Sequence, residues 1–114
     1  MPKKIKGLAP SLREKKRYLR FEILTLDNQK LFLTKPMNEV IKKLREILGV
    51  FDSADAGIVP IKYEAKLNQA IIRVSTRSLD KIKAAFLFIT TLGTQEVIIK
   101  SLKVSGNINK VMEE

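Results

Sequence analysis

The sequence of 114 residues contains no cysteine and no histidine. Without cysteine there is no disulfide, no thiolate zinc site and no thiol nucleophile. Without histidine, Ser-His-Asp triads, imidazole general bases and the common histidine-based metal sites are excluded. No apolar run approaches the roughly 18 residues that a membrane span needs, and no apolar segment of a secretory signal follows the basic start. We therefore expect a soluble, cytoplasmic protein without membrane attachment.

Charge is the unusual quantity in this composition. The length suits one ordinary domain, and apolar residues make up 45% of it, but 22 Lys and Arg against 12 Asp and Glu leave a net charge of +10. Residues 1–20 hold eight basic residues and one acidic residue, so they carry +7 of that total. The sequence thus predicts a basic arm at 1–16, a single α/β sandwich domain at 17–106 and a short tail at 107–114. Such a surface attracts polyanions, of which nucleic acid is the usual one.

The first half of the domain shows one strand pattern and one helix pattern. Alternating apolar residues predict a strand from Tyr18 to Leu26, with one buried face formed by Leu19, Phe21 and Ile23. Apolar residues at helical spacing then predict a helix, which we expect to begin at an N-cap on Thr34 and to end at Gly49. Residues 50–57 are expected to form a connection.

The second half repeats the theme with an extra strand. A strand is predicted from Ile58 to Ala65, at an edge or a bulge because it contains Pro60, and it pairs in a hairpin with 70–75. A helix capped by Ser78 is expected to run from Leu79 to Leu92, followed by a last strand from 97 to 104. The order predicts the α+β, ferredoxin-like (RRM-like) βαββαβ sandwich, an antiparallel sheet with two helices on one face.

The helix-free face of that sheet is expected to be less polar than a face that meets only water. Strand alternation directs a mixed set of apolar and basic side chains there, namely Leu24, Leu26, Ile71, Arg73, Ile98, Lys100 and Leu102. A mixed face of this kind indicates a surface for RNA or for a protein partner. The alternative is that residues of the arm or the tail fold over it.

The basic run before the first strand is the strongest functional signal. Its candidate RNA contacts are Arg13, Lys15, Lys16, Arg17, Tyr18 and Arg20, of which the tyrosine could stack on a base. Arg73, Lys100 and Lys103 would extend this surface if they face the same way. The candidate partner-binding residues are Ile71, Ile98 and Leu102. The alternative interpretation of the run is a solvated tail that only aids solubility.

Other patterns are weaker. The strand at 70–75 lacks the aromatic residues with which an RRM stacks bases, so backbone and shape contacts with RNA are expected instead. Asp52 and Asp55 are too few for a two-metal nuclease site and are expected to serve a turn and a helix end. Ser105-Gly106-Asn107 could form a small anion nest but is more typical of a turn. We predict no catalytic residue, no metal site and no cofactor bound by the protein.

Three blocks of the chain resemble one family. They are the run from Ser11 to Glu22 (SLREKKRYLRFE), the segment AIIRVS at 70–75 with the helix after it, and VIIKSLKVSGNI at 97–108. Together they are similar to the ribonuclease P protein component 2, or Pop-five, family of archaea and eukaryotes. Asn107 stands where that family usually has threonine, and the basic stretch that often follows is missing after Lys110.

The resemblance implies a subunit of the ribonucleoprotein that removes 5′ leaders from precursor tRNA. In that family the ribonuclease P RNA performs catalysis with Mg²⁺, and the protein supports the RNA's catalytic domain, so its contact with precursor tRNA is indirect. The direct protein partner is component 3, two such pairs can join through component 2, and further ribonuclease P subunits complete the particle. Two alternatives remain: another ferredoxin-like RNA-binding protein, ribosomal or tRNA-associated, and a regulatory domain that binds a small ligand.

Overall fold

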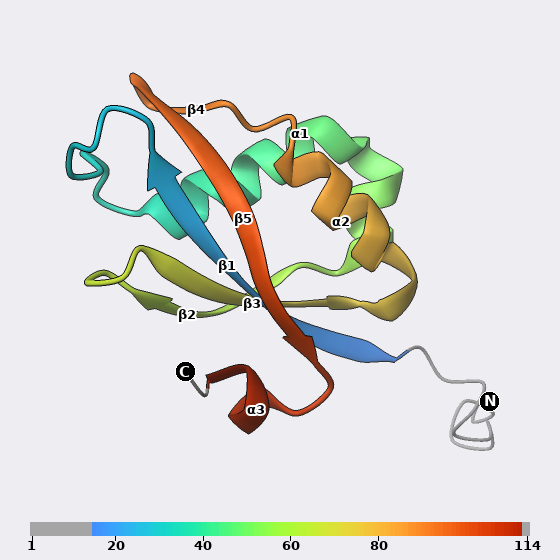
Figure 1. Cartoon of the computed structure of the whole chain (residues 1–114). Coiled ribbons are helices and arrows are strands. Elements are labelled where there is room, and N and C mark those ends of the chain that lie inside the picture. Colours follow the sequence, from blue (N-terminus) through green and yellow to red (C-terminus); the bar gives the residue numbers. More distant parts are fainter. Residues whose placement is uncertain (1–14, 113–114) are drawn as a thin grey trace, which may run out of the picture.

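The computed structural model describes residues 15–112, which form one antiparallel sheet with helices on both sides (Figure 1). Its strand order is β2-β3-β1-β5-β4. The elements in chain order are β1 (Lys16–Thr25), α1 (Pro36–Ala56), β2 (Val59–Glu64), β3 (Gln69–Ser75), the 3₁₀ turn η3 (Thr76–Ser78), α2 (Leu79–Phe86), β4 (Thr91–Leu92), β5 (Gln95–Ser105) and α3 (Ile108–Met112). The ferredoxin-like βαββαβ order is confirmed, with β4 as an added short strand.

The core lies between the sheet and the two longer helices, α1 and α2. Leu19, Phe21 and Ile23 of β1 are buried there, as their alternation predicts. The ring of Phe21 meets that of Phe86 from α2 at a centroid distance of 5.0 Å and a tilt of 48°. This tilted arrangement is one of the favourable geometries for aromatic pairs. The face that carries Phe21 is therefore committed to packing, and only the opposite face of the central strand remains for other roles.

The structure corrects the expected end of the first helix. Helical turns continue past Gly49 to Ala56, although Gly49 itself has φ 83° and ψ 177°, which places a sharp kink there. Residues 50–56, expected as a connection, are thus a second helical stretch, closed by Gly57 in the left-handed conformation. The helix also begins one residue later than expected, since Lys35 rather than Thr34 is the N-cap and Pro36 fills the first position.

This second stretch explains the two aspartates. Asp55 accepts a hydrogen bond from Arg77 of η3, and Asp52 lies 3.4 Å from Lys81 of α2, so both carboxylates of α1 form ion pairs with the segment that follows β3. The expected turn at these residues is wrong. Both pairs are exposed to solvent, so they add little to the packing of the two helices.

The second helix is shorter than expected. It begins at Leu79 as expected but ends at Phe86, and the chain then tightens through i→i+3 hydrogen bonds at Leu87, Phe88 and Ile89. Thr90 and Thr91, which are β-branched and favour extended backbone, follow. The oxygen of Thr90 accepts from the amide of Val97, and β4 forms a tight hairpin with β5 through Gly93.

The hairpin of β2 and β3 agrees with its sequence pattern. β2 is an edge strand, and its register shifts between Pro60 and Lys62, so the proline stands at both an edge and a bulge. The loop between β1 and α1 is held by Gln95 of β5, a buried side chain that the sequence did not single out. Its amide accepts from the backbone of Phe32 and donates to that of Lys30.

The expected C-terminal tail is partly a helix. Ser105 and Asn107 form the predicted turn, and the side chain of Asn107 accepts from the amide of Asn109 at the start of α3. This short helix packs on β1 and β5 on the side away from α1 and α2 (Figure 1). Val111 of this helix is fully buried. In the described range, 15–112, no helix is long and apolar enough to cross a membrane.

Candidate nucleic-acid interface

The face of the sheet opposite α1 and α2 keeps the name helix-free face, although the short helix α3 covers part of it. The register of the sheet arranges the side chains of this face in rows. Cross-strand neighbours in an antiparallel sheet point to the same side, so the pairing of β2, β3, β1 and β5 defines each row. One row reads Lys62, Ile71, Arg20 and Lys103; the next reads Glu64, Gln69, Glu22 and Lys100; on the other side of the first lie Val59, Arg73, Tyr18 and Ser105. Five of the sequence-predicted RNA contacts therefore share this face: Tyr18, Arg20, Arg73, Lys100 and Lys103.

An irregularity in β5 brings its two lysines to the same side. Lys100 pairs with Glu22 and Lys103 with Arg20, which are two residues apart on β1, although the lysines are three apart on β5. The pairing shifts between Arg20 and Phe21, so β5 carries one extra residue there. A bulge of this kind changes which residues face each side beyond it. Simple alternation would have directed Lys100 and Lys103 to opposite faces.

Arg20 is used within the protein. Its Nε donates to Gln69 Oε1 at 2.7 Å, and its Nη1 donates to the backbone oxygen of Val111 at 3.2 Å. The guanidinium thus joins β1 to β3 on one side and to α3 on the other. A contact of Arg20 with RNA stays a prediction, but this side chain also fixes the helix that covers part of the face.

Arg73 and Tyr18 form a cross-strand pair in the row next to Arg20, and both side chains are partly buried. The Nε atom of Arg73 is buried and has no hydrogen-bond partner within residues 15–112. Buried donors without a partner are uncommon in folded proteins, because each forfeits its bonds to water. Only the exposed part of the Arg73 side chain is therefore available to a ligand.

The basic residues before Tyr18 are tied to the domain by backbone contacts. The oxygen of Lys15 accepts from both the amide and the hydroxyl of Thr76, and β1 begins at Lys16. The guanidinium of Arg17 lies against Gly106, where an added Cβ would come within 3.3 Å of Nη1. The boundary expected between an arm at 1–16 and the domain thus falls inside an ordered strand start. Arg13 lies outside the described residues.

The predicted partner-binding residues separate into two groups. Ile98 and Leu102 are exposed by 49% and 39%, and Ile98 pairs directly with the exposed Leu24. Ile71 faces the same side, but only 4% of it is exposed, so its expected exposure is wrong. Ile71 and Met112 of α3 line the same small pocket on this face. The alternation of residues in a strand does not reveal that α3 lies there.

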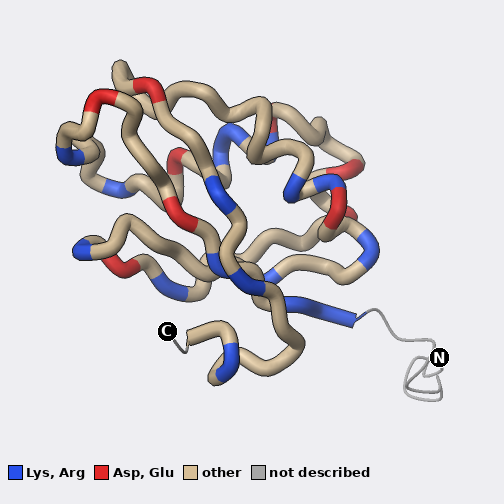
Figure 2. Tube along the Cα trace, viewed as in Figure 1, with Lys and Arg blue, Asp and Glu red and all other residues tan. Residues whose placement is uncertain are grey.

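Basic residues gather at one part of this face. Figure 2 shows Lys and Arg segments at the start of β1 and where β1 and β5 cross, while acidic segments are spread over the hairpins, the helices and the middle of β1. Lys62 completes the central row, a place that the sequence did not predict because it depends on the shifted register of β2. Within the described range no three acidic residues gather as a metal site would require. The basic residues of this face can bind phosphates.

The family model described as the Rpp14/Pop5 family matches residues 17–114. The chain is 30% identical over 112 residues to ribonuclease P protein component 2 of Pyrococcus abyssi, covering 97% of this chain and 92% of that protein. It is 32% identical over 106 residues to the protein of the same name from Methanocaldococcus jannaschii, covering 93% and 76%.

A solved structure supports the fold. A chain in the cryo-EM structure of yeast ribonuclease MRP superposes with a TM-score of 0.61, covering 84% of this chain and 77% of that one. The sequence identity is 15%, so this similarity concerns the fold alone.

Proposed function

Since the chain belongs to the Rpp14/Pop5 family, we propose that it is a non-catalytic protein subunit of ribonuclease P that binds the catalytic domain of the enzyme's RNA. In this role it assists an RNA that removes 5′ leaders from precursor tRNA in the cytoplasm. The relatives named ribonuclease P protein component 2 support the assignment to this particle. The structure supports the finer role through the basic sheet face.

The observation that carries the proposal is the gathering of Tyr18, Arg73, Lys100 and Lys103 on one face beside the start of β1. Lys and Arg bind RNA by neutralising phosphates and releasing counterions. Tyr18 offers an aromatic ring to a base or a ribose. Because the RNA repels itself when it folds compactly, cations supplied by the protein should let it hold its active fold with less Mg²⁺.

The apolar part of the same face suits a protein partner. Leu24 and Ile98 are exposed neighbours, and Leu102 lies further along β5. Apolar side chains that remain together in contact with water are typical of interaction sites. We assign this part to the pairing with ribonuclease P protein component 3, and the basic part to RNA.

The test is cleavage of a precursor tRNA by ribonuclease P RNA with component 3 at limiting Mg²⁺, with and without this protein. Addition of the chain should lower the Mg²⁺ concentration that gives half-maximal cleavage. The double variant Lys100→Gln/Lys103→Gln should lose part of that gain. The matched control, Lys42→Gln/Lys83→Gln, removes the same charge from the exposed sides of the two helices and should keep it.

Two results would contradict the proposal. If both double variants behave alike, the sheet face is not the RNA-binding surface. If the wild-type chain binds RNA but never affects cleavage, while an authentic component 2 does, a ribosomal or tRNA-associated role becomes the better interpretation.

A further inference from the structure

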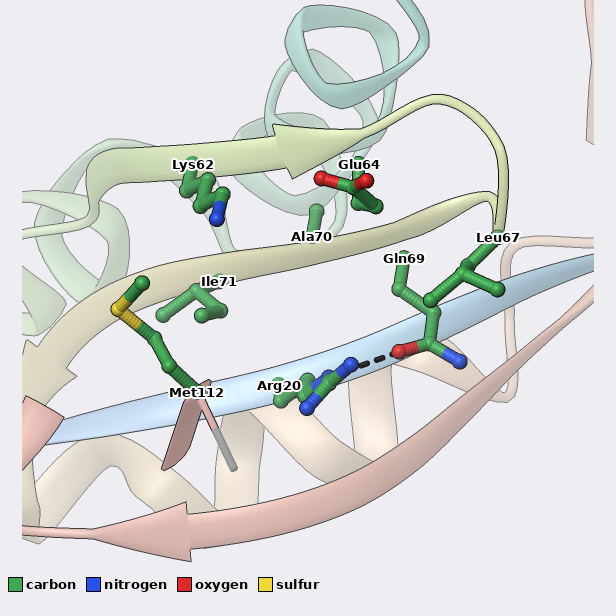
Figure 3. Close-up of a pocket in the computed structure, with 8 residues that line it drawn as sticks. All are labelled: Arg20, Lys62, Glu64, Leu67, Gln69, Ala70, Ile71 and Met112. Carbon is green, nitrogen blue, oxygen red and sulfur yellow. Dashed lines mark hydrogen bonds between the residues drawn. The ribbon is translucent and has the colours of Figure 1, made fainter. Parts of the chain in front are cut away.

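A pocket opens on the helix-free face between the β2–β3 hairpin and α3 (Figure 3). Its volume is about 140 Å³. That is well below the roughly 300–1,000 Å³ of pockets that enclose a drug-sized ligand, so it admits one small planar group. The residues that define its chemistry are Arg20, Lys62, Glu64, Gln69, Ile71 and Met112.

Glu64 and Gln69 line one end of the pocket, where the Gln69 amide turns toward Arg20 (Figure 3). Glu64 and Gln69 are cross-strand partners. The oxygen of the Gln69 amide accepts from Arg20 Nε, which leaves its amino group as the donor that is not used in this bond. The Glu64 carboxylate has no hydrogen-bond or ion-pair partner among residues 15–112. This carboxylate is partly buried and lies on a face otherwise rich in cations. A ligand with hydrogen-bond donors would therefore be a suitable partner for it.

The other walls supply an apolar platform and flanking cations. Ile71 and Met112 stand together at the end opposite Gln69, and Leu67 covers the hairpin side (Figure 3). Ring faces pack well on such side chains, and the methionine sulfur adapts to them. Lys62 and Arg20 lie on either side of Ile71 in the same row, so a negative group that leaves the pocket meets a cation on both sides.

We propose that this pocket binds a single unstacked guanine base of RNA. Guanine presents two adjacent N–H donors on its Watson–Crick edge, which match the two oxygens of Glu64. Adenine, cytosine and uracil each place an acceptor where the carboxylate needs a second donor, and a phosphate group is repelled by it. Single-stranded bases read on this edge are the usual targets of sequence-specific RNA recognition.

This inference rests on the proposed function for its RNA, but it adds a base preference that phosphate contacts cannot supply. The cations on the face act on any sequence. A carboxylate that accepts from guanine acts only on one base. The two contributions are therefore separable by experiment.

The test uses the full chain and two labelled six-nucleotide RNAs, UUGUUU and UUUUUU. We expect the wild-type protein to bind the guanosine-containing RNA about tenfold more tightly, the scale of one good bidentate base contact. Glu64→Gln should abolish this preference while the affinity for UUUUUU stays the same or rises, because a negative charge is lost. The matched control, Glu96→Gln, removes an exposed carboxylate of β5 away from the pocket and should keep the preference.

A second measurement locates the ligand. Guanosine monophosphate should shift the methyl NMR signals of Ile71 and Met112, and inosine monophosphate, which lacks one of the two donors, should shift them less. The proposal that this pocket binds guanine is overturned if the wild-type protein shows no preference for UUGUUU over UUUUUU, or if Glu64→Gln keeps that preference. If either of these results is found while the protein still increases precursor-tRNA cleavage, the proposed function is retained and only the guanine site is rejected. A missing gain in cleavage overturns the proposed function, while the hexamer measurement still decides the pocket.

Discussion

The guanidinium of Arg20 lies 3.2 Å from the backbone oxygen of Val111, and this hydrogen bond connects the central strand to the short helix α3. The same side chain orients Gln69. A residue that reads in sequence as part of a basic RNA-binding run thus organises the face on which RNA is proposed to bind. A substitution at Arg20 is therefore expected to affect both the stability of the protein and its binding of RNA.

Replacement of Arg20 by methionine keeps most of the aliphatic stem and removes both hydrogen bonds. We expect the free energy of unfolding to fall by about 1–3 kcal/mol, since each such bond contributes about 1 kcal/mol and leaves a partner unsatisfied. Amide hydrogen exchange at Val111, which bonds to Asn107 within α3, should accelerate more than exchange in β3. Arg45→Met on the exposed side of α1 serves as control, and equal destabilisation by the two variants would contradict the role.

Gly49 within α1 and Gly57 at its C-cap should respond differently to replacement by asparagine. Gly57 has the ordinary left-handed conformation, which asparagine tolerates, so Gly57→Asn is expected to cost about 1 kcal/mol or less. Gly49, at φ 83° and ψ 177°, lies in a region that is essentially restricted to glycine, and Gly49→Asn should cost about 2–3 kcal/mol. Space is not the reason, because a Cβ at Gly49 would meet no atom within 4 Å. Urea denaturation of both variants measures the difference, and equal costs would show that the kink is not required.

Tyr63 should give the protein a pH dependence at high pH. Burial raises the pKa of its hydroxyl, which also lies 2.9 Å from Asn68 Oδ1, above the ordinary value of about 10. The folded state thus holds this proton more tightly than the unfolded state does. The resulting stability is fully present below pH 10 and is lost as the pH rises through the folded-state pKa.

The variant Tyr18→Phe isolates this group, because the sequence has two tyrosines. Its ultraviolet titration should show a midpoint above 10 that returns to about 10 in concentrated urea. The advantage of Tyr63 over Tyr63→Phe in the free energy of unfolding should shrink above pH 10. An unchanged midpoint in urea would contradict the assignment to burial.

Salt dependence should distinguish the lysines of the sheet face from those of the helices. In a plot of the logarithm of RNA affinity against the logarithm of salt concentration, each lost phosphate contact reduces the slope by about 0.7–0.9. Lys103→Gln is expected to reduce it by about that amount, and Lys42→Gln should leave it unchanged. A slope that is insensitive to Lys103 would remove this residue from the interface.

Local pattern predicts most of the scaffold. The period-two alternation of β1 correctly indicates which side chains are buried, and helical spacing locates α1 and α2, because both signals depend on near neighbours in the chain. The predicted helix bounds are wrong at segments that contact distant parts of the chain. Residues 50–56 continue the helix beyond Gly49 and carry Asp52 and Asp55 to Lys81 and Arg77, and the chain after Phe86 turns to pair with β5.

The candidate site was predicted less completely for the same reason. The alternation of side chains along β3 correctly directs Ile71 to the helix-free face. Its burial, however, depends on α3, which lies more than thirty residues further along the chain. Lys103 shares a face with Lys100 only because β5 contains an extra residue. Alternation cannot locate a bulge, since the shift is defined by the partner strand.

The central position of β1 has a consequence for how the chain folds during synthesis. β1, which precedes the other strands of the described residues, is paired on one side with β3 and on the other with β5, so Tyr18 meets Arg73 and Ser105. Until the ribosome has delivered β5, one edge of β1 has no partner and is available for wrong pairing with another chain. Such long closures slow folding. The nascent protein therefore stays vulnerable to aggregation until β5 has emerged.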